Sequence, residues 1–181
     1  MNKPSPYPVM NSLADNNVIG DERNFFRLRE ADSKEKFGNL IMIQPGKEYE
    51  FYTLFCNAGK PSLKENGTLH NVRLQVTIPR HIDDHKLCRA EAVLTSDNSD
   101  PGTVWCGSFM WSEVPVDLEY VQDSARLHSD KTDKEGLLLS PDVFKKGGTL
   151  LGIKKLDGEL PCTGLDCVGH VLIKMKAFKS K

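Results

Sequence analysis

The sequence predicts an all-β fold, an antiparallel β-sandwich with long loops and at most one or two short helices. Three observations support it. Apolar and polar residues alternate along several short segments, turn-forming residues separate these segments, and no long amphipathic helix pattern is present. Strands do not alternate with long helices, which disfavours a doubly wound fold.

The clearest strand lies in NVRLQVTIP, from Asn71 to Pro79. Its apolar and polar residues alternate with a period of two, which is typical of a half-buried strand. The segment EYEFYTLFC, from Glu48 to Cys56, is aromatic and β-branched on both faces and predicts a central strand. Further strands are expected in NFFRLRE, NLIMIQ, RAEAVLTS, VWCGSFMW, VDLEYV, ARLHS and GHVLIKMKAF.

Helix signals are few. In SPDVFKKGG, Ser140 is a suitable N-cap, Pro141 suits the first helical position, and glycines follow, so one short helix is expected there. The segment 79–93 has room for one or two further helical turns.

Length and composition fit one globular domain. The chain has 181 residues, 39% of them hydrophobic, and a formal net charge of -1, so neither a nucleic-acid groove nor an anionic membrane is the expected partner. Apolar runs are too short for a transmembrane helix, and the opening residues lack the apolar core of a secretory signal. We expect residues 1–14 to be a flexible Pro-rich segment and residues 15–178 to form a single elaborated sandwich, without direct membrane insertion.

The five cysteines do not suggest a complete disulfide framework, because their number is odd, and no zinc-type C-x-x-C pair is present. Cys162 and Cys167 form the one close pair. A disulfide between them and two reduced thiols are both compatible with this spacing.

Several motifs resemble a bacterial cell-surface conserved-repeat domain, an immunoglobulin-like sandwich of unknown function. In that family a Pro-Gly or Gly turn opens a strand ending in Asn-x-Gly, and a second strand runs from Asn-Val to Pro. The matching positions here are Pro45-Gly46, Asn57-Ala58-Gly59, Asn71-Val72 and Pro79.

A wider pattern, including DNNVIGDERNFFRLREA, VWCGSF and VDLEYVQDSARLHS, is similar to a module in exported and membrane-attached proteins of Gram-positive bacteria, especially actinobacteria. The resemblance implies a non-enzymatic role in adhesion, spacing or recognition of a protein or glycan partner. It also implies an extracellular or cell-surface location within a longer exported protein. The cysteines depart from such modules, which leaves a cytoplasmic location open.

Two groups of residues are candidates for partner binding. Asp21, Glu22 and Arg23 either satisfy backbone groups and pair with each other at the entrance to the first strand, or form a binding pocket. Trp105 and Trp111 share one side of a predicted strand. Large aromatic residues are usually buried, so packing in the core is the favoured interpretation, and an exposed platform for a glycan or peptide is the alternative.

Metal chemistry has weaker signals. His81 and His85 would share one face of a helix, which is the basis for an alternative reading as a metal-dependent hydrolase or toxin-like effector, although a polar loop is favoured. Asp97, Asn98 and Asp100 offer oxygen ligands for calcium, but their spacing is not that of an EF-hand. No other cofactor is expected.

A third reading keeps the sandwich and adds an intramolecular Lys–Asn isopeptide bond. Lys47 or Lys174 would react with Asn57 or Asn71. A charged lysine is rarely buried without a partner, which disfavours this reading.

Overall fold

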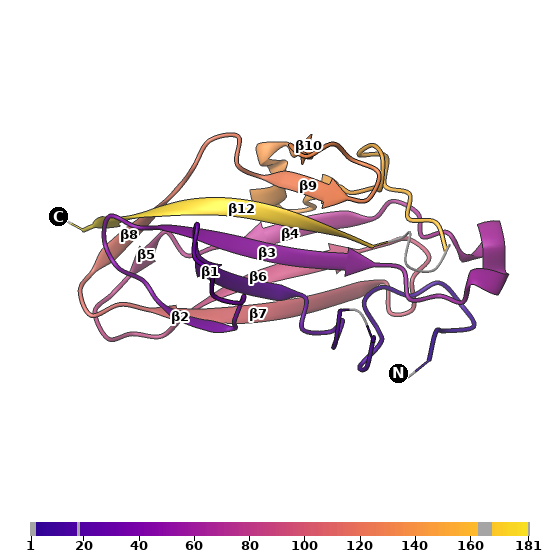
Figure 1. Cartoon of the computed structure of the whole chain (residues 1–181), viewed down its shortest axis with the longest axis horizontal. Coiled ribbons are helices and arrows are strands. Elements are labelled where there is room, and N and C mark those ends of the chain that lie inside the picture. The colour runs from indigo at the N-terminus through magenta and orange to yellow at the C-terminus, as the bar shows by residue number, and fades with distance from the viewer. Residues whose placement is uncertain (1–2, 18, 163–167, 181) are drawn as a thin grey trace.

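The computed structural model describes residues 3–17, 19–162 and 168–180 and is a β-sandwich of two curled sheets (Figure 1). Sheet 1 contains β1 (Phe26–Glu30), β3 (Glu48–Cys56), β12 (Val168–Lys179), β8 (Val116–Tyr120) and β5 (His81–Ile82) in that order, with β9 (Arg126–Ser129) and β10 (Leu137–Leu138) attached beside β12. Sheet 2 has the order β11 (Thr149–Leu150), β4 (Arg73–Thr77), β6 (Cys88–Thr95), β7 (Thr103–Trp111) and β2 (Leu40–Met42). The predicted antiparallel β-sandwich is confirmed.

Strands β3 and β12 form the centre of sheet 1. They pair along the whole of β3, from Cys56 opposite Val168 to Glu48 opposite Lys176. The other edge of β12 pairs with β9 near its start and with β8 near its end. The expected central position of the strand at 48–56 is therefore confirmed.

Strand β2 differs from the other strands because it pairs with β7 in parallel. Leu40 lies opposite Phe109 and Met42 opposite Trp111, so β2 covers the last three residues of β7. Just before β2, Gly38 exchanges two backbone hydrogen bonds with Leu28 of β1. The chain therefore crosses from sheet 1 to sheet 2 immediately before β2 begins.

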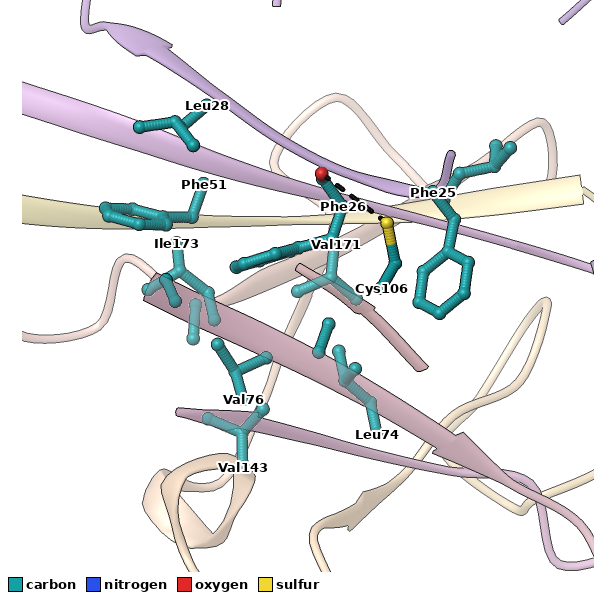
Figure 2. Packing of buried hydrophobic residues seen from close by; sticks show 14 of the residues in the cluster. Phe25, Phe26, Leu28, Phe51, Leu74, Val76, Cys106, Val143, Val171 and Ile173 are labelled. Carbon is teal, nitrogen blue, oxygen red and sulfur yellow. Dashed lines mark hydrogen bonds between the residues drawn. The ribbon is translucent and has the colours of Figure 1, made fainter. Parts of the chain in front are cut away.

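The core lies between the inner faces of the two sheets (Figure 2). Phe26 of β1 and Phe51 of β3 are fully buried, with their ring centroids 6.1 Å apart. Leu74 and Val76 of β4 face them from sheet 2, and the alternation predicted for this strand is confirmed. Burial of each such side chain contributes about 1.5–3 kcal/mol, so this layer is the main source of stability.

Two short 3-10 helices are present in the described residues, Pro61–Gly67 (η1) and Pro141–Phe144 (η2). Ser140 caps η2, because its side chain accepts a hydrogen bond from the Asp142 backbone N–H. The expectation of a helical turn in 79–93 is wrong. This stretch forms β5, a turn at His85 with φ of 57°, and the start of β6.

Part of the N-terminal segment that we expected to be flexible packs against the end of β3. Val9 and Met10 are buried. Asn11 uses both ends of its amide there: Nδ2 donates to the Leu54 carbonyl at 2.9 Å, and Oδ1 accepts from the Cys56 N–H at 2.8 Å. This segment is therefore joined to the backbone at the end of β3, beside the buried residues Leu54 and Cys56.

Candidate functional site

The outer face of sheet 2 carries an unusual group of apolar and charged side chains, named here the β7 face. It comprises Leu40, Leu87, Arg89, Glu91, Trp105, Gly107, Phe109 and Trp111. Of the seven large apolar side chains that are exposed in the described residues, four lie here. Trp105 is 62% exposed, Leu40 61% and Phe109 39%, and Leu87 lies immediately before β6. Exposed apolar side chains gathered on one face are a mark of an interaction surface.

Strand register sets the order of side chains across this face. Phe109 lies between Leu40 on β2 and Arg89 on β6. Trp105 is separated from Phe109 by Gly107, because alternate residues of a strand face the same side. Leu40 and Phe109 therefore form an apolar pair, and Trp105 lies further along β7 on the same side.

Arg89 connects the two aromatic positions. Its guanidinium carbon lies 4.6 Å from the centroid of the Trp105 ring, and its side chain also forms an ion pair with Glu91. Arg89 is opposite Phe109 in the register, so it reaches diagonally across Gly107 to Trp105. A Cβ at position 107 would lie 2.5 Å from Arg89 Nε, so the missing side chain of Gly107 is what allows this path.

Burial in the core was the favoured interpretation for the tryptophans of β7, and it is wrong for Trp105. The inner face of β7 carries the small buried residues Cys106 and Ser108 instead, and the Cys106 thiol lies against the Phe26 carbonyl (Figure 2). Ser108 Oγ donates to the Phe26 carbonyl at 2.6 Å. Trp111 is partly exposed on the same outer side as Trp105.

Signals for this face were present in the sequence but incomplete. Cys106, Ser108 and Met110 alternate with Trp105, Phe109 and Trp111, so the two sets must face opposite sides. Arg89 and Gly107 were not predicted as part of a site, because their contact depends on the pairing of β6 with β7.

The acidic and basic residues before β1 have local roles. Glu22 is buried, and its carboxylate accepts hydrogen bonds from the Leu13 N–H and the Asn16 side chain, both at 2.9 Å. Arg23 pairs with Asp21 through two hydrogen bonds of 2.7 and 2.8 Å. These bonds lower the pKa of the Asp21 carboxyl from 3.8 to about 2. The contacts fit the expectation that these residues satisfy backbone groups and pair with each other.

The histidines at positions 81 and 85 are not on one helical face. His81 lies in β5, where Nδ1 is 2.7 Å from an Asp117 oxygen and Nε2 is 3.3 Å from an Asp83 oxygen. Hydrogen bonds to these carboxylates, first to Asp117, raise the pKa of His81. Within the described ranges, no three His, Cys, Asp or Glu side chains are grouped closely enough to hold a metal ion.

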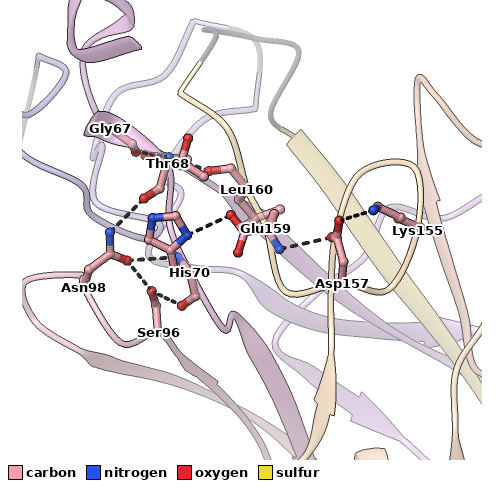
Figure 3. Close-up of polar contacts among 10 residues, drawn as sticks. Gly67, Thr68, His70, Ser96, Asn98, Lys155, Asp157, Glu159 and Leu160 are labelled. Atoms are coloured by element: carbon pink, nitrogen blue, oxygen red, sulfur yellow. Dashed lines mark hydrogen bonds and ion pairs between the residues drawn. The ribbon is translucent and has the colours of Figure 1, made fainter. Parts of the chain in front are cut away.

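The loop proposed to bind calcium is held by hydrogen bonds to the entrance of β4 (Figure 3). Asn98 Oδ1 accepts from the His70 N–H at 2.9 Å, and Asn98 Nδ2 donates to the Thr68 carbonyl at 2.8 Å. Asp97 accepts from the Asn71 side chain at 3.1 Å, and the Asp100 N–H donates to the Pro8 carbonyl at 3.3 Å. These contacts account for the loop without a cation, and calcium binding stays a prediction.

The sequence suggested two covalent cross-links, a disulfide and a Lys–Asn isopeptide bond. Cys167 lies outside the described residues, so a Cys162–Cys167 disulfide stays a prediction.

The lysines and asparagines proposed for the isopeptide bond make other contacts. Lys174 lies 3.6 Å from Glu50 near the start of β3, whereas Asn57 follows its end and donates to the Gly67 and Leu160 carbonyls. Lys47 pairs with Glu30 at 2.8 Å.

A stack of rings, named here the sheet-1 stack, covers part of the outer face of sheet 1. The Arg29 guanidinium carbon lies 4.2 Å from the Phe37 centroid, and the Phe37 and Tyr52 centroids are 5.0 Å apart. The series continues to His170 at 5.1 Å and then to His128 at 5.3 Å. Burial of the imidazole, together with the neighbouring His128, lowers the pKa of His170 from 6.5 to about 4.

Two hollows lie away from the β7 face. A groove of about 830 Å³ runs between β4, β8 and η2, with walls that include Ile78, Arg80, Tyr120 and Phe144. A smaller hollow of about 380 Å³ lies beside the contacts of Figure 3, between Thr68, Lys155 and Glu159. Their walls come from separate segments of the chain, which is why no sequence motif marked them.

No protein-family model, curated protein or solved structure matches this chain. Neither 3-10 helix of the described chain has the length and apolar character that a membrane-spanning helix needs. Function is therefore inferred from the geometry of the β7 face.

Proposed function

We propose that the chain is a non-enzymatic β-sandwich module that recognises a partner through the β7 face. The observation that carries the proposal is the exposure of Trp105, Leu40 and Phe109 together on one sheet. Exposing such side chains to water is unfavourable, and a partner that covered them would recover about 25 cal/mol for each Å² of apolar surface removed from water.

The composition of the face supports recognition. Tryptophan, phenylalanine and arginine are enriched in the energetically important parts of interfaces. Arg89 is already ordered by Glu91 and by the Trp105 ring, so binding would cost less side-chain entropy than it would for an unrestrained arginine. The β7 face is thus chemically suited and partly preorganised.

The proposed setting is an immunoglobulin-like domain of an exported or cell-surface bacterial protein, with adhesion, spacing or recognition as its role. It is supported by the motifs at Pro45-Gly46, Asn57-Ala58-Gly59 and Asn71-Val72 that resemble cell-surface repeats. The positions of Gly46 in a turn and of Asn57 directly after β3 fit the places that these motifs have in the resemblance.

The proposal is tested by screening the purified protein against an array of bacterial glycans and a displayed library of random linear peptides. For any binder found, Trp105→Ala is expected to weaken the affinity by at least roughly tenfold, as for a residue at the centre of an interface. The matched control is Phe178→Ala. Phe178 is 39% exposed, as is Phe109, but lies on β12 of the other sheet. Equal effects of the two substitutions, or no binder in either screen, would overturn the proposal.

A further inference from the structure

The edge of sheet 2 beside β2 is paired along only part of β7. The Phe109 N–H donates to the Asn39 carbonyl and the Trp111 carbonyl accepts from the Ile43 N–H, both at 2.7 Å. The backbone groups of alternate strand residues point to the same edge. Thr103, Trp105 and Gly107 therefore direct their N–H and C=O groups to this edge too.

No strand of the described chain pairs with this part of the edge. The reason is the path of the chain before β2, since Gly38 pairs with Leu28 of sheet 1 and cannot continue along β7. Within residues 3–17, 19–162 and 168–180, the Trp105 and Gly107 backbones have no hydrogen-bond partner on this edge. Gly107 is partly exposed, and because it has no side chain, that exposure belongs to its backbone.

The open edge also lacks the sequence features that usually keep an edge strand from pairing with another chain. Natural edge strands are commonly short or carry a lysine, a proline or an inward-pointing charge that discourages pairing with another chain. The sequence of this stretch, TVWCGS from Thr103 to Ser108, contains no charged residue and no proline. An unprotected edge next to exposed aromatic rings is suited to accept another strand.

We propose that the partner is a polypeptide in extended conformation, which adds a strand to sheet 2 along Thr103–Gly107, beyond the end covered by β2. A row of N–H and C=O groups that repeats every second residue is matched by a peptide backbone in strand conformation. Alternate side chains of the added strand lie on the outer face beside Trp105, which favours apolar or aromatic residues there. This inference rests on the proposed function and names its partner class.

The state of the edge is measured first in the protein alone, by amide hydrogen exchange followed with NMR. The Trp105 and Gly107 amides are expected to exchange at least roughly tenfold faster than those of Cys106 and Ser108, which point to β6 in the same strand. Slow exchange of all four amides would show that the edge is closed and would overturn the inference.

The partner is then tested with a peptide selected from the displayed random library. The peptide is synthesised with a single N-methyl group at each position in turn, which removes one backbone donor without changing the protein. Strand addition predicts a period of two, with methylation of alternate amides weakening binding at least roughly tenfold and methylation of the others leaving it nearly unchanged. Bound peptide should also slow exchange at Trp105 and Gly107.

The outcomes separate this inference from the proposed function. A glycan binder that is lost with Trp105→Ala keeps the β7 face as the recognition surface and overturns strand addition. A peptide whose binding is weakened by N-methylation without a period of two also leaves the β7 face as the recognition surface and overturns strand addition. Concentration-dependent dimers in sedimentation velocity, with the Trp105 and Gly107 amides protected in the dimer, would assign the edge to a second copy and overturn the inference. Binders that are indifferent to Trp105→Ala would overturn the proposed function itself.

Discussion

Arg29 and Arg89 occupy similar chemical settings on opposite faces of the sandwich. Each pairs with a glutamate and lies over an aromatic ring: Arg29 with Glu50 and Phe37, Arg89 with Glu91 and Trp105. The side chain of Glu50 is only 8% exposed, whereas that of Glu91 is 36% exposed.

The difference lies in what surrounds each group. Arg29 is one end of the sheet-1 stack, and Glu50 contacts a second cation, Lys174. The Arg89 group lies at the surface of sheet 2, where Trp105 stays 62% exposed although the Arg89 guanidinium lies over its ring. The same set of residue types is thus a structural element on one sheet and an available surface on the other.

The largest expected effect is a difference in folding stability between variants of the two arginines. Arg29→Met should destabilise the fold by about 3 kcal/mol, because it leaves the buried Glu50 carboxylate with only its longer contact to Lys174. Arg89→Met should cost less than about 1 kcal/mol, since its ion pair is exposed to solvent. Urea denaturation of both variants measures the difference. Similar losses of stability in the two variants would contradict the difference in burial between the two arginine–glutamate pairs.

Lowering the pH should destabilise the fold through the sheet-1 stack. The pKa of His170 is lowered from 6.5 to about 4, so the unfolded chain takes up its proton at a higher pH than the folded one. The stability contributed by neutral His170 is complete above pH 6.5 and is lost as the pH falls towards about 4. We expect a loss of about 2 kcal/mol, allowing for the part of the ring in contact with water.

His170→Phe is the control for this experiment, because it retains a ring between Tyr52 and His128 but cannot titrate. Chemical denaturation at several pH values should show a shallower loss of stability for the variant across this range. Parallel curves for the two proteins would contradict the assignment to His170.

The smallest expected effect compares the two aromatic partners of the arginines. Phe37→Ala removes contacts with both Tyr52 and Arg29 and should cost about 1 kcal/mol. Trp105→Ala should change stability by less than about 0.5 kcal/mol, since an exposed side chain contributes little to the folded state. Thermal unfolding provides the measurement. A larger loss for Trp105→Ala than for Phe37→Ala would make Trp105 a structural residue and weaken its proposed role in recognition.

Local patterns predicted the fold class and most strands. The segment at 48–56 forms β3 with those boundaries, and the alternation around Leu74 and Val76 places both in the core. Ser140 caps η2 as its sequence context indicated. These features depend on neighbouring residues, so they can be recognised in one segment alone.

The candidate site could be predicted only in part, because it depends on long-range packing. Alternation indicated that Trp105 and Trp111 share a side, but not that this side faces outward. On the inner side of β7, Cys106 and Ser108 are buried and contact the Phe26 carbonyl of β1, so the tryptophans face outward. Likewise, the open edge of β7 results from the pairing of Gly38 with β1, which no local pattern reports.

The position of β12 has a consequence for the order in which the fold can be made. It is the last strand along the described chain, yet it holds β3, β8 and β9 together. During translation the strands of sheet 2 all leave the ribosome first, and β3 has only β1 as a partner until β12, more than a hundred residues further along the chain, has emerged. Sheet 1 can close only after β12 has emerged, so nascent chains that stop earlier would leave one edge of the aromatic strand β3 unpaired.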